Sequence, residues 1–452
     1  MGRDTARVPM GLDLPRERTL VMGILNATDD SFSGDGYGDN TEALVRRGVE
    51  MERDGADILD VGAASSRPGH AEVTPEQELR RALMAVRRLR EAVSVPISID
   101  STREAVVDAC LQAGASIAND VSGLEDDRLA MAVARSQAWL LIAHSRTRPR
   151  SEPEREADPD SVVGLVRDDL RVAVDRAQAV GVPRDRVIVD PGLGFAKTAA
   201  ESFALLRRLR EIREVAPVLA GSSRKGHLGA VTGRTVDQRI FASASATAAA
   251  VLGGADIVRV HDVGAMVDVV RVADAVRRGV RMRAAFIGLG ANVGPARETL
   301  QRALKELGRL GRVVGVSGLW RSEPMYVASQ PPFLNAVARL ETALASPSTL
   351  VRELKRIERD LGRVAHERYG PREIDLDLLL FADAATAERE GDVAVPHERI
   401  AERRFVLGPL AEVAPDAIDP RSGKSVRELL AAVADQRAEP IEGQGWWTTA
   451  SS

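Results

Sequence analysis

A chain of 452 residues with 44% hydrophobic and 28% charged residues has the composition of a globular protein, and its length suits roughly two or three domains. The net charge of −4 argues against a protein that coats nucleic acid or lies on a membrane surface, because both partners favour a basic excess. The one cysteine, Cys110, excludes a disulfide within the chain and makes a cysteine-based metal site unexpected. The N-terminus lacks the apolar core of a signal peptide and no stretch has the length of a membrane span, so we expect a cytoplasmic protein.

Short apolar segments rich in β-branched residues recur through residues 1–280, and each is followed by amphipathic sequence of helical length. The segments span 20–25, 58–61, 96–100, 116–119, 139–143, 187–190, 217–220 and 257–260. Strand–helix alternation predicts a parallel sheet, and eight repeats in about 270 residues match a TIM (β/α)₈ barrel. An open, doubly wound α/β sheet is the alternative.

Polar residues stand at or just beyond the carboxyl ends of these predicted strands. They are Asn26, Asp60, Asp100, Asn119, His144, Asp190, Arg224 with Lys225, and Arg259. One such residue is usually a helix cap, but a barrel brings all of these ends to one face, where its active sites lie. The pattern therefore favours the barrel and predicts an enzyme with its site at that mouth.

The predicted mouth has the chemistry to bind a planar amino-heterocycle that carries phosphate. Asp190, followed by Pro-Gly, could accept two N–H groups of the heterocycle, with Asn119 and Asp100 completing the recognition edge. Residues 221–226 and 259–262 add cations after the last two strands, where barrels often bind phosphate. Asn26 could ligate a Mg²⁺ that neutralises a leaving phosphate. Each of these segments alone could also be an ordinary polar turn.

Taken together and in this order, the motifs of the barrel resemble those of dihydropteroate synthase. The matching segments are 23–33, 65–69, 119–123, 190–192, 223–225 and 259–262. The resemblance implies that the pterin is held by Asp100, Asn119, Asp190 and Lys225. It implies a p-aminobenzoate pocket of Ser66, Arg67, Pro68 and Ser223. It implies pyrophosphate binding by Asn26, Arg259 and His261, with Mg²⁺ at Asn26 and with Lys225 and Arg259 as catalytic groups.

The reaction implied by this resemblance is condensation of dihydropterin pyrophosphate with p-aminobenzoate, which gives 7,8-dihydropteroate and pyrophosphate. The family also implies a homodimer formed through the barrel. Several loops depart from the family pattern, since Asp29 stands where a proline is usual and Ala64 where a glutamate is usual. Two alternatives therefore stay open: a degenerate pterin-binding scaffold, and a barrel that transfers a methyl group to a corrinoid partner.

A second domain is expected over residues 281–452, where the rhythm of elements restarts. Strands are predicted at 284–290, 313–321, 333–341 and 374–381, and helices between the first two and at 348–361. This β-α-β-β-α-β order is typical of a ferredoxin-like α+β domain.

The segment around Asp375 and Asp377 predicts a metal site. One residue separates them in an apolar strand, so both carboxylates point to the same face. Mg²⁺ held by one or two carboxylates and nucleotide phosphates would relieve their repulsion, and Arg363 and Arg372 would bind phosphate oxygens. A solvated strand face with compensating arginines is the alternative.

Along its length the second domain resembles 6-hydroxymethyl-7,8-dihydropterin pyrophosphokinase. The resemblance is carried by residues 288–294, 333–335, 370–377 and 395–397. It implies ATP binding by Glu358, Arg363, Arg372, His397 and Arg403, with Arg363 and Arg372 catalytic. It implies pterin binding by Phe333, Asn335 and Phe405, and Mg²⁺ at Asp375 and Asp377. The product of such a kinase is the substrate of the synthase, so the sequence predicts a bifunctional folate-biosynthesis enzyme that acts on small molecules.

Overall fold

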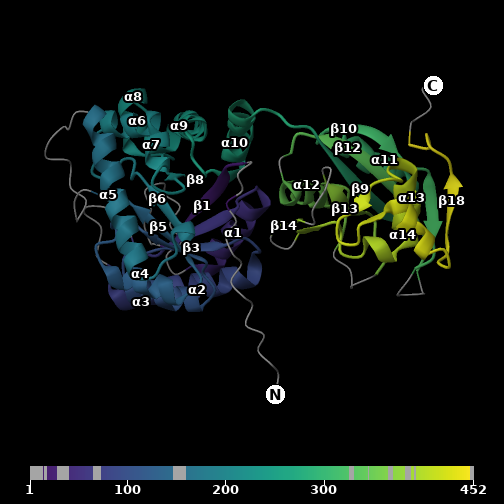
Figure 1. Ribbon diagram of the computed structural model, residues 1–452, viewed down its shortest axis with the longest axis horizontal. Coiled ribbons are helices and arrows are strands. Elements are labelled where there is room, and N and C mark those ends of the chain that lie inside the picture. The colour runs from purple at the N-terminus through teal and green to yellow at the C-terminus, as the bar shows by residue number, and fades with distance from the viewer. Residues whose placement is uncertain are drawn as a thin grey trace, which may run out of the picture. The chain divides into compact units, whose positions relative to one another are not determined.

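The computed structural model divides at Gly279 into two compact units, unit 1 up to Gly279 and unit 2 from Val280 onward (Figure 1). Each unit has its own buried apolar core. No helix in the described part of the chain is long and apolar enough to cross a membrane. The structure describes residue 14 and residues 18–27, 40–64, 73–145, 159–324, 330–344, 346–364, 370–381, 388–390 and 393–447.

Unit 1 is a barrel of eight parallel strands, which confirms the predicted TIM fold. The strands are β1 (Leu20–Asn26), β2 (Ile58–Gly62), β3 (Ile97–Asp100), β4 (Ile117–Asp120), β5 (Trp139–Ala143), β6 (Val187–Asp190), β7 (Leu219–Ala220) and β8 (Ile257–Val260). They follow the order β6-β5-β4-β3-β2-β1-β8-β7, and a parallel bridge between Val189 and Val218 joins the two ends of the ring.

Helices surround the barrel, as Figure 1 shows. They are α1 (Thr41–Arg53), α2 (Pro75–Ala92), α3 (Glu104–Gln112), α4 (Asp127–Arg135), α5 (Pro159–Ala179), α6 (Ala199–Arg207), α7 (Leu209–Arg213), α8 (Gly226–Thr232), α9 (Ile240–Gly253) and α10 (Val263–Arg278). Local sequence sets several of their starts: α2 begins with a capping box of Thr74 and Gln77, and α6 with one of Thr198 and Glu201. In each box a side chain satisfies a backbone N–H that the first helical turn leaves free.

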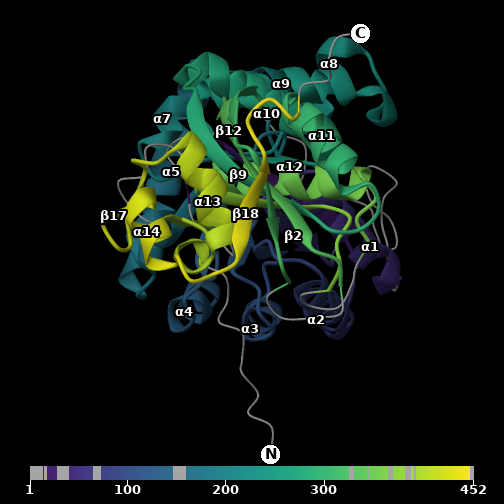
Figure 2. The same ribbon diagram turned by 90° about the vertical axis from the view of Figure 1, so that its right-hand side faces the viewer.

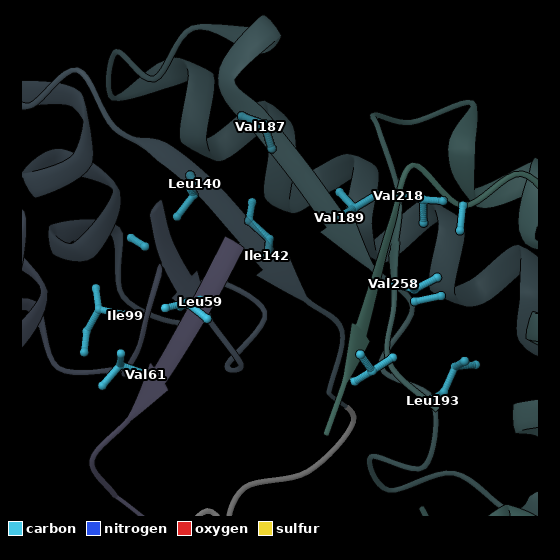
Figure 3. Close-up of a cluster of buried hydrophobic side chains, with 14 of the residues drawn as sticks. Leu59, Val61, Ile99, Leu140, Ile142, Val187, Val189, Leu193, Val218 and Val258 are labelled. Carbon is cyan, nitrogen blue, oxygen red and sulfur yellow. The ribbon is translucent and has the colours of Figure 1, made fainter. Parts of the chain in front are cut away.

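Alternation along the strands divides their side chains between the outer face of the barrel and its interior. Outward side chains pack against the helices; Figure 3 shows part of this layer, with Leu140 and Ile142 on β5 beside Val187 and Val189 on β6. Burial of such a side chain stabilises the fold by about 1.5–3 kcal/mol. The interior is apolar at the amino ends of the strands, where it contains Leu20, Met22, Ile58, Ile117, Leu141, Ile188, Leu219 and Ile257.

The next interior layer is polar. Two positions beyond an apolar residue of β2, β4, β6 and β8 stand Asp60, Asn119, Asp190 and Arg259. Because side chains of a strand repeat every second residue on one face, these four groups point into the same interior toward the carboxyl ends of the strands. The apolar layer closes the barrel from below, and the polar layer forms the floor of its mouth.

Unit 2 is built on an antiparallel sheet with the β-α-β-β-α-β order predicted for a ferredoxin-like domain. Its strands are β9 (Arg283–Ala291), β10 (Arg312–Val316), β11 (Leu319–Ser322), β12 (Phe333–Thr342), β13 (Asp375–Phe381) and β18 (Ala438–Glu442). The order across the sheet is β13-β9-β12-β11-β18, and β10 also pairs with β12. The expected single strand 313–321 is divided into β10 and β11 at Ser317 and Gly318, because the N–H of Gly318 donates to the Glu412 carboxylate instead of a neighbouring strand.

Helices cover both faces of this sheet. They are α11 (Ala296–Leu307), α12 (Pro347–Asp360), α13 (Arg404–Val413) and α14 (Val426–Ala432), and two short hairpins are formed by β14 (Glu388–Glu390) with β15 (Val393–Val395) and by β16 (Ile418–Asp419) with β17 (Lys424–Ser425). Along β9, Ala285 and Ile287 belong to the core under α11 and α12, whereas Phe286 belongs to the core under α13 and α14. Figure 2 shows α13 and α14 together with β18.

The C-terminal segment closes one edge of the sheet in unit 2. Strand β18 pairs with β11, and Trp446 beyond it is 5% exposed. The Trp446 indole Nε1 donates to the carbonyl oxygen of Ser317 at 2.9 Å, while its own carbonyl accepts from Gln301 at 2.9 Å. This tail is therefore part of the folded unit, in which β18 is the edge strand and β11 lies inside the sheet.

Candidate active sites

The floor of the barrel mouth is a cluster of ion pairs and hydrogen bonds. The guanidinium of Arg259 donates from Nε to Asp60 at 2.6 Å and from Nη2 to Asp100 at 3.0 Å. Asp60, which has no exposed surface, also accepts from the Asn119 amide Nδ2 at 3.2 Å. A buried charge persists only when it is paired and hydrogen-bonded, and this network supplies both conditions. The fold thus brings together three predicted residues and adds Asp60.

Two acceptors in this floor are available to a ligand. The Asn119 side-chain oxygen is buried, and no described residue donates to it. Asp190 is 4% exposed and accepts from the Gly192 N–H at 2.7 Å. Burial raises the pKa of the Asp190 carboxyl above its ordinary value, although Lys225 and Arg259 oppose the shift. A ligand with N–H donors would stabilise such a carboxylate, because its hydrogen bonds replace those to water that burial has removed.

The loop after β6 is tied to the rest of the mouth by two lysines. Lys225 donates to the carbonyl of Leu193 at 2.6 Å, and its Nζ lies 4.0 Å from the centre of the Phe195 ring. Lys197 is 7% exposed and donates to the carbonyls of Gly192 at 3.0 Å and Phe195 at 3.2 Å. The cation of Lys225 therefore lies beside the loop that carries Asp190.

The loops after β7 and β8 are joined to one another. Ser223 Oγ lies 3.1 Å from Nδ1 of His261, and Arg224 donates from Nε to Asp262 at 3.0 Å. Ser222 Oγ is buried, and none of the described residues is its hydrogen-bond partner. At the end of β1, Asn26 faces Gly62 in the register with β2. These loops hold polar groups around the mouth in the position predicted for phosphate.

The structure does not test every residue proposed for the barrel. Ser66, Arg67 and Pro68 lie outside the described residues, so the expected p-aminobenzoate pocket is represented only by Ser223. Sequence analysis assigned no role to Asp60 or Lys197. The sequence places Asp60 among the strand-end polar residues of the predicted mouth, but without a role of its own. Lys197 had no such signal, since it lies in a loop and is recognised only by its burial.

Unit 2 contains a cavity of about 120 Å³ on the face of the sheet that α13 partly covers. Its walls include Phe333, Asn335, Arg372, Asp375, Asp377, Arg403 and Phe405. Gly288 and Gly290 of β9 also line the cavity, and a β-carbon at these positions would lie 3.3 Å from Leu379 and 3.5 Å from Asn335, respectively. The cavity thus has aromatic rings and an amide, together with two carboxylates and two guanidinium groups.

The acidic part of this cavity carries several cations. Arg363 donates to Asp375 Oδ1 at 2.7 Å, and Arg372 donates to the other oxygen of the same carboxylate. Lys355 lies 3.8 Å from one oxygen of Asp375 and 3.8 Å from one of Asp377. Although burial would raise the pKa of Asp375, these three cations hold it below its ordinary value. Asp375 is therefore an anion over the whole physiological range.

Glu358 supports the acidic strand from below. It is 2% exposed, forms an ion pair with Arg363, and accepts from the backbone N–H of Leu376 at 2.7 Å. Lys355 donates to its Oε1 at 2.7 Å. Glu358 is not among the residues that line the cavity. Its contacts indicate that it orients Arg363 and Lys355. Lys355 was missed by sequence analysis, because nothing in helix α12 marks which of its cations faces β13.

Two further predicted residues stand near the other end of the cavity. Nδ1 of His397 accepts from the Arg399 N–H at 3.2 Å, so Nε2 carries the proton in the neutral ring. Burial lowers the pKa of His397, with Arg403 acting in the same direction against Asp377 and Asp375. The Arg403 Nε is buried and finds no acceptor among the described residues, which leaves a donor for a ligand oxygen.

The residues of both sites fit Mg²⁺ only together with a ligand. No group of three or more His, Cys, Asp or Glu side chains within the described ranges is placed to hold a metal ion alone. Asp375 and Asp377 present two carboxylates on one strand face, and the guanidinium groups of Arg372 and Arg403 line the same cavity. This donor set is the one in which Mg²⁺ keeps several waters and takes its other ligands from substrate phosphates.

Comparison with known families defines the class of each unit. The family model of pterin binding enzymes matches residues 22–261, and that of 7,8-dihydro-6-hydroxymethylpterin-pyrophosphokinase matches residues 286–415. The barrel with its buried recognition edge and the unit with its acidic cavity therefore define a pterin-processing enzyme.

Related proteins specify the barrel further. The dihydropteroate synthase of Synechocystis sp. is 40% identical over 266 residues, which are 58% of this chain and 91% of that protein. The dihydropteroate synthase of Mycobacterium leprae is 42% identical over 264 residues, 56% of this chain and 92% of that protein. The chain belongs to the dihydropteroate synthase family and continues into a pyrophosphokinase domain, which makes it a bifunctional enzyme of folate synthesis.

Solved structures agree with this assignment. The dihydropteroate synthase of Burkholderia cenocepacia complexed with 7,8-dihydropteroate is 39% identical, with a TM-score of 0.53, and the match covers 60% of this chain and 96% of that one. The Xanthomonas albilineans enzyme with 4-aminobenzoic acid is 38% identical, with a TM-score of 0.53 and coverage of 59% and 95%. These neighbours favour a working synthase over a degenerate barrel.

Proposed function

We propose that the two units catalyse consecutive steps. Unit 2 transfers pyrophosphate from ATP to 6-hydroxymethyl-7,8-dihydropterin and releases AMP. Unit 1 condenses the resulting pyrophosphate ester with p-aminobenzoate to give 7,8-dihydropteroate and pyrophosphate. The observation that carries the proposal is the composition of the cavity in unit 2, which combines aromatic rings with two carboxylates and two arginines in one space.

In the kinase site, Phe333 and Phe405 would stack on the pterin while Asn335 bonds its edge. Their support is that all three side chains line the cavity and that Asn335 is buried and held by Ser322 at 3.0 Å. Offset stacking on two rings positions a flat heterocycle and excludes water from one side of the reacting hydroxyl.

The phosphates of ATP would be bound by Arg363, Arg372, His397 and Arg403, with Arg363 and Arg372 as catalytic groups and Glu358 as their support. Guanidinium groups stabilise the charge that spreads over phosphoryl oxygens during in-line transfer. Mg²⁺ held by Asp375 and Asp377 would neutralise further phosphate charge when bound. The two carboxylates lie in the wall that also contains Arg372.

In the barrel, the pterin would be recognised by Asp190, Asn119, Asp100 and Lys225. The Asn119 oxygen, to which no described residue donates, and the buried carboxyl of Asp190 support this role, because both can accept N–H groups that an aminopterin ring provides.

The leaving pyrophosphate would lie near Asn26, Arg259 and His261. The positive charges of Arg259 and Lys225 would stabilise the negative charge that develops on it as it leaves. The loops after β7 and β8 support this placement, since Ser223 and His261 are held together there. Mg²⁺ at Asn26 would add charge neutralisation. Ser66, Arg67, Pro68 and Ser223 remain the proposed p-aminobenzoate pocket.

A homodimer formed through the barrel and a cytoplasmic location also remain proposals. The dimer is supported by apolar side chains exposed on neighbouring helices, Phe241 of α9 and Val272 and Val276 of α10.

Two reciprocal variants test the assignment of the two reactions. Asp375→Asn should lower AMP formation by about 100-fold or more, because it removes charge from the metal and phosphate site. Asp190→Asn should lower dihydropteroate formation to a similar degree, because the carboxyl no longer accepts two N–H groups. AMP and dihydropteroate are both measured by chromatography on the full chain, the second from dihydropterin pyrophosphate and p-aminobenzoate without ATP.

Each variant serves as the control for the other. Asp375→Asn should leave condensation unchanged, and Asp190→Asn should leave AMP release unchanged. A wild-type chain that releases AMP but forms no dihydropteroate would contradict the proposed function of the barrel. Near-wild-type AMP formation by Asp375→Asn would contradict that of unit 2.

A further inference from the structure

Lys355 of α12 reaches across to the strand that carries the paired carboxylates. Its ammonium nitrogen lies 3.8 Å from Asp375 Oδ1 and 3.8 Å from Asp377 Oδ1. Two hydrogen bonds fix it there, one to Glu358 Oε1 at 2.7 Å and one to the Leu376 carbonyl at 3.0 Å. A divalent ion bound to both carboxylates would lie close to this ammonium group and would be repelled by its positive charge.

Both carboxylate oxygens of Asp375 already accept a hydrogen bond from an arginine. Arg363 bonds one of its oxygens at 2.7 Å, and Arg372 bonds the other. A metal ion that approaches alone must therefore share Asp375 with two guanidinium groups, whose positive charge repels it. It obtains no third carboxylate in exchange, because Glu358 is buried and is bound by Lys355, Arg363 and the Leu376 N–H.

The charges of the six groups that contact one another around Asp375 sum to zero. The cations Lys355, Arg363 and Arg372 face the three carboxylates of Glu358, Asp375 and Asp377. A divalent cation alone adds two positive charges to a neutral cluster. The same cation bound to a nucleoside triphosphate brings phosphate oxygens that the arginines can bind, so the carboxylates can turn from the arginines to the metal.

We propose that Lys355 is a positioning residue that makes metal binding depend on the nucleotide. In the absence of nucleotide, the Lys355 ammonium group neutralises part of the charge of the paired carboxylates and repels a divalent ion that arrives alone. When the metal and the triphosphate bind together, the same group stabilises the negative charge that the triphosphate brings. The inference rests on the proposed kinase function, because it needs Asp375 and Asp377 to be the metal ligands. An ordinary salt bridge between Lys355 and Glu358 on the helix surface would have no such effect on metal binding.

Binding of Mn²⁺, followed by the electron paramagnetic resonance of the free ion, tests this on the full chain. The wild type, Lys355→Met and Lys355→Arg are titrated with and without a non-hydrolysable ATP analogue. A double variant, Asp375→Asn with Asp377→Asn, measures the Mn²⁺ bound elsewhere. Lys305→Met is the matched control, since Lys305 is an exposed lysine of the neighbouring helix α11.

Wild type should bind Mn²⁺ weakly alone and more tightly with the analogue. Without the analogue, Lys355→Met should bind Mn²⁺ about tenfold more tightly, because a like charge a few ångströms from the metal position is gone. The analogue should then tighten Mn²⁺ binding less than in wild type. Lys355→Arg and Lys305→Met should keep the wild-type pattern, and dihydropteroate formation should be unchanged in all variants.

Equal Mn²⁺ affinity of wild type and Lys355→Met without the analogue would overturn the inference and leave the metal site standing. If wild type binds no more Mn²⁺ than the double carboxylate variant even with the analogue, the proposed metal site itself fails and the inference falls with it. A tighter site in Lys355→Met that keeps its full response to the analogue would also overturn the coupling.

Discussion

His227 of α8 is a histidine that the barrel uses as an aromatic core residue. Its side chain is buried, its ring meets Phe203 edge-on at 5.4 Å, and no described residue bonds either ring nitrogen. Burial lowers the pKa of His227 to about 4, and Lys225 and Arg239 add to the effect. The ring is therefore neutral at physiological pH, and protonation would place an unpaired charge in the core.

This residue should make the stability of unit 1 fall in mild acid. Because the pKa in the folded state lies below the ordinary value of 6.5, only the unfolded chain binds a proton between pH 6.5 and 4. The contribution of the neutral His227 ring to the free energy of unfolding is complete above pH 6.5. It is lost as pH falls toward 4, and the loss is at most about 3 kcal/mol. His227→Phe should remove this part of the pH dependence. Urea unfolding of unit 1 at pH 7 and pH 5 measures it, and parallel losses in both proteins would contradict the argument.

At the scale of elements, the loop after β6 owes its shape to the end of β5. Gly192 has a φ of +67°, and a β-carbon there would come within 2.0 Å of the His144 carbonyl, so only glycine fits. Lys197 fills the space between the two segments and lies 3.0 Å from His144 Nδ1, which must accept the bond. His144 Nε2 thus carries the proton and points to Asp169 at 3.0 Å.

Lys197→Met should therefore impair condensation although Lys197 is not placed against substrate. The variant loses the bonds that hold Gly192 and Phe195, and Asp190 at the start of the loop becomes less well positioned. A misplaced binding group of this kind costs about tenfold to 100-fold in kcat/KM. Steady-state condensation kinetics test this, with AMP formation as the internal control. Unchanged kcat/KM for dihydropterin pyrophosphate would show that the loop keeps its shape without the lysine.

At the scale of the whole molecule, the chain contains two independent sets of cores. Buried apolar clusters of unit 1 end at Ala273, and those of unit 2 begin at Ala285. The residues described for the cavity belong to unit 2, and those described for the floor of the barrel mouth belong to unit 1. Domains with separate cores are in principle able to fold separately.

Residues 1–279 and 280–452, produced as separate chains, should therefore each fold and keep one activity. The first should form dihydropteroate from dihydropterin pyrophosphate, and the second should release AMP from ATP, each within about threefold of the full chain. Circular dichroism and the two assays measure this. Loss of either activity in a folded fragment would show that the site needs the other unit.

Much of the fold followed from local patterns. The alternation of short apolar segments with amphipathic stretches predicted the barrel, because strand and helix periodicities are properties of neighbouring residues. The same locality placed Asp375 and Asp377 on one face, and it placed Asp190 and Asn119 at strand ends. The division of the strand at Gly318 was not predicted, since it depends on Glu412, which lies far along the chain.

The chemical groups of both sites were thus readable along the chain, whereas their pairing was decided by tertiary structure. Arg259 meets Asp60 across 199 positions, and Trp446 meets Ser317 across 129. Lys355 reaches Asp377 only because α12 packs beside β13. Contacts of this kind depend on closure of the barrel and on packing of helices against the sheet. Residues that pair across such distances follow no periodic pattern in the sequence, so the sequence alone does not predict the pair.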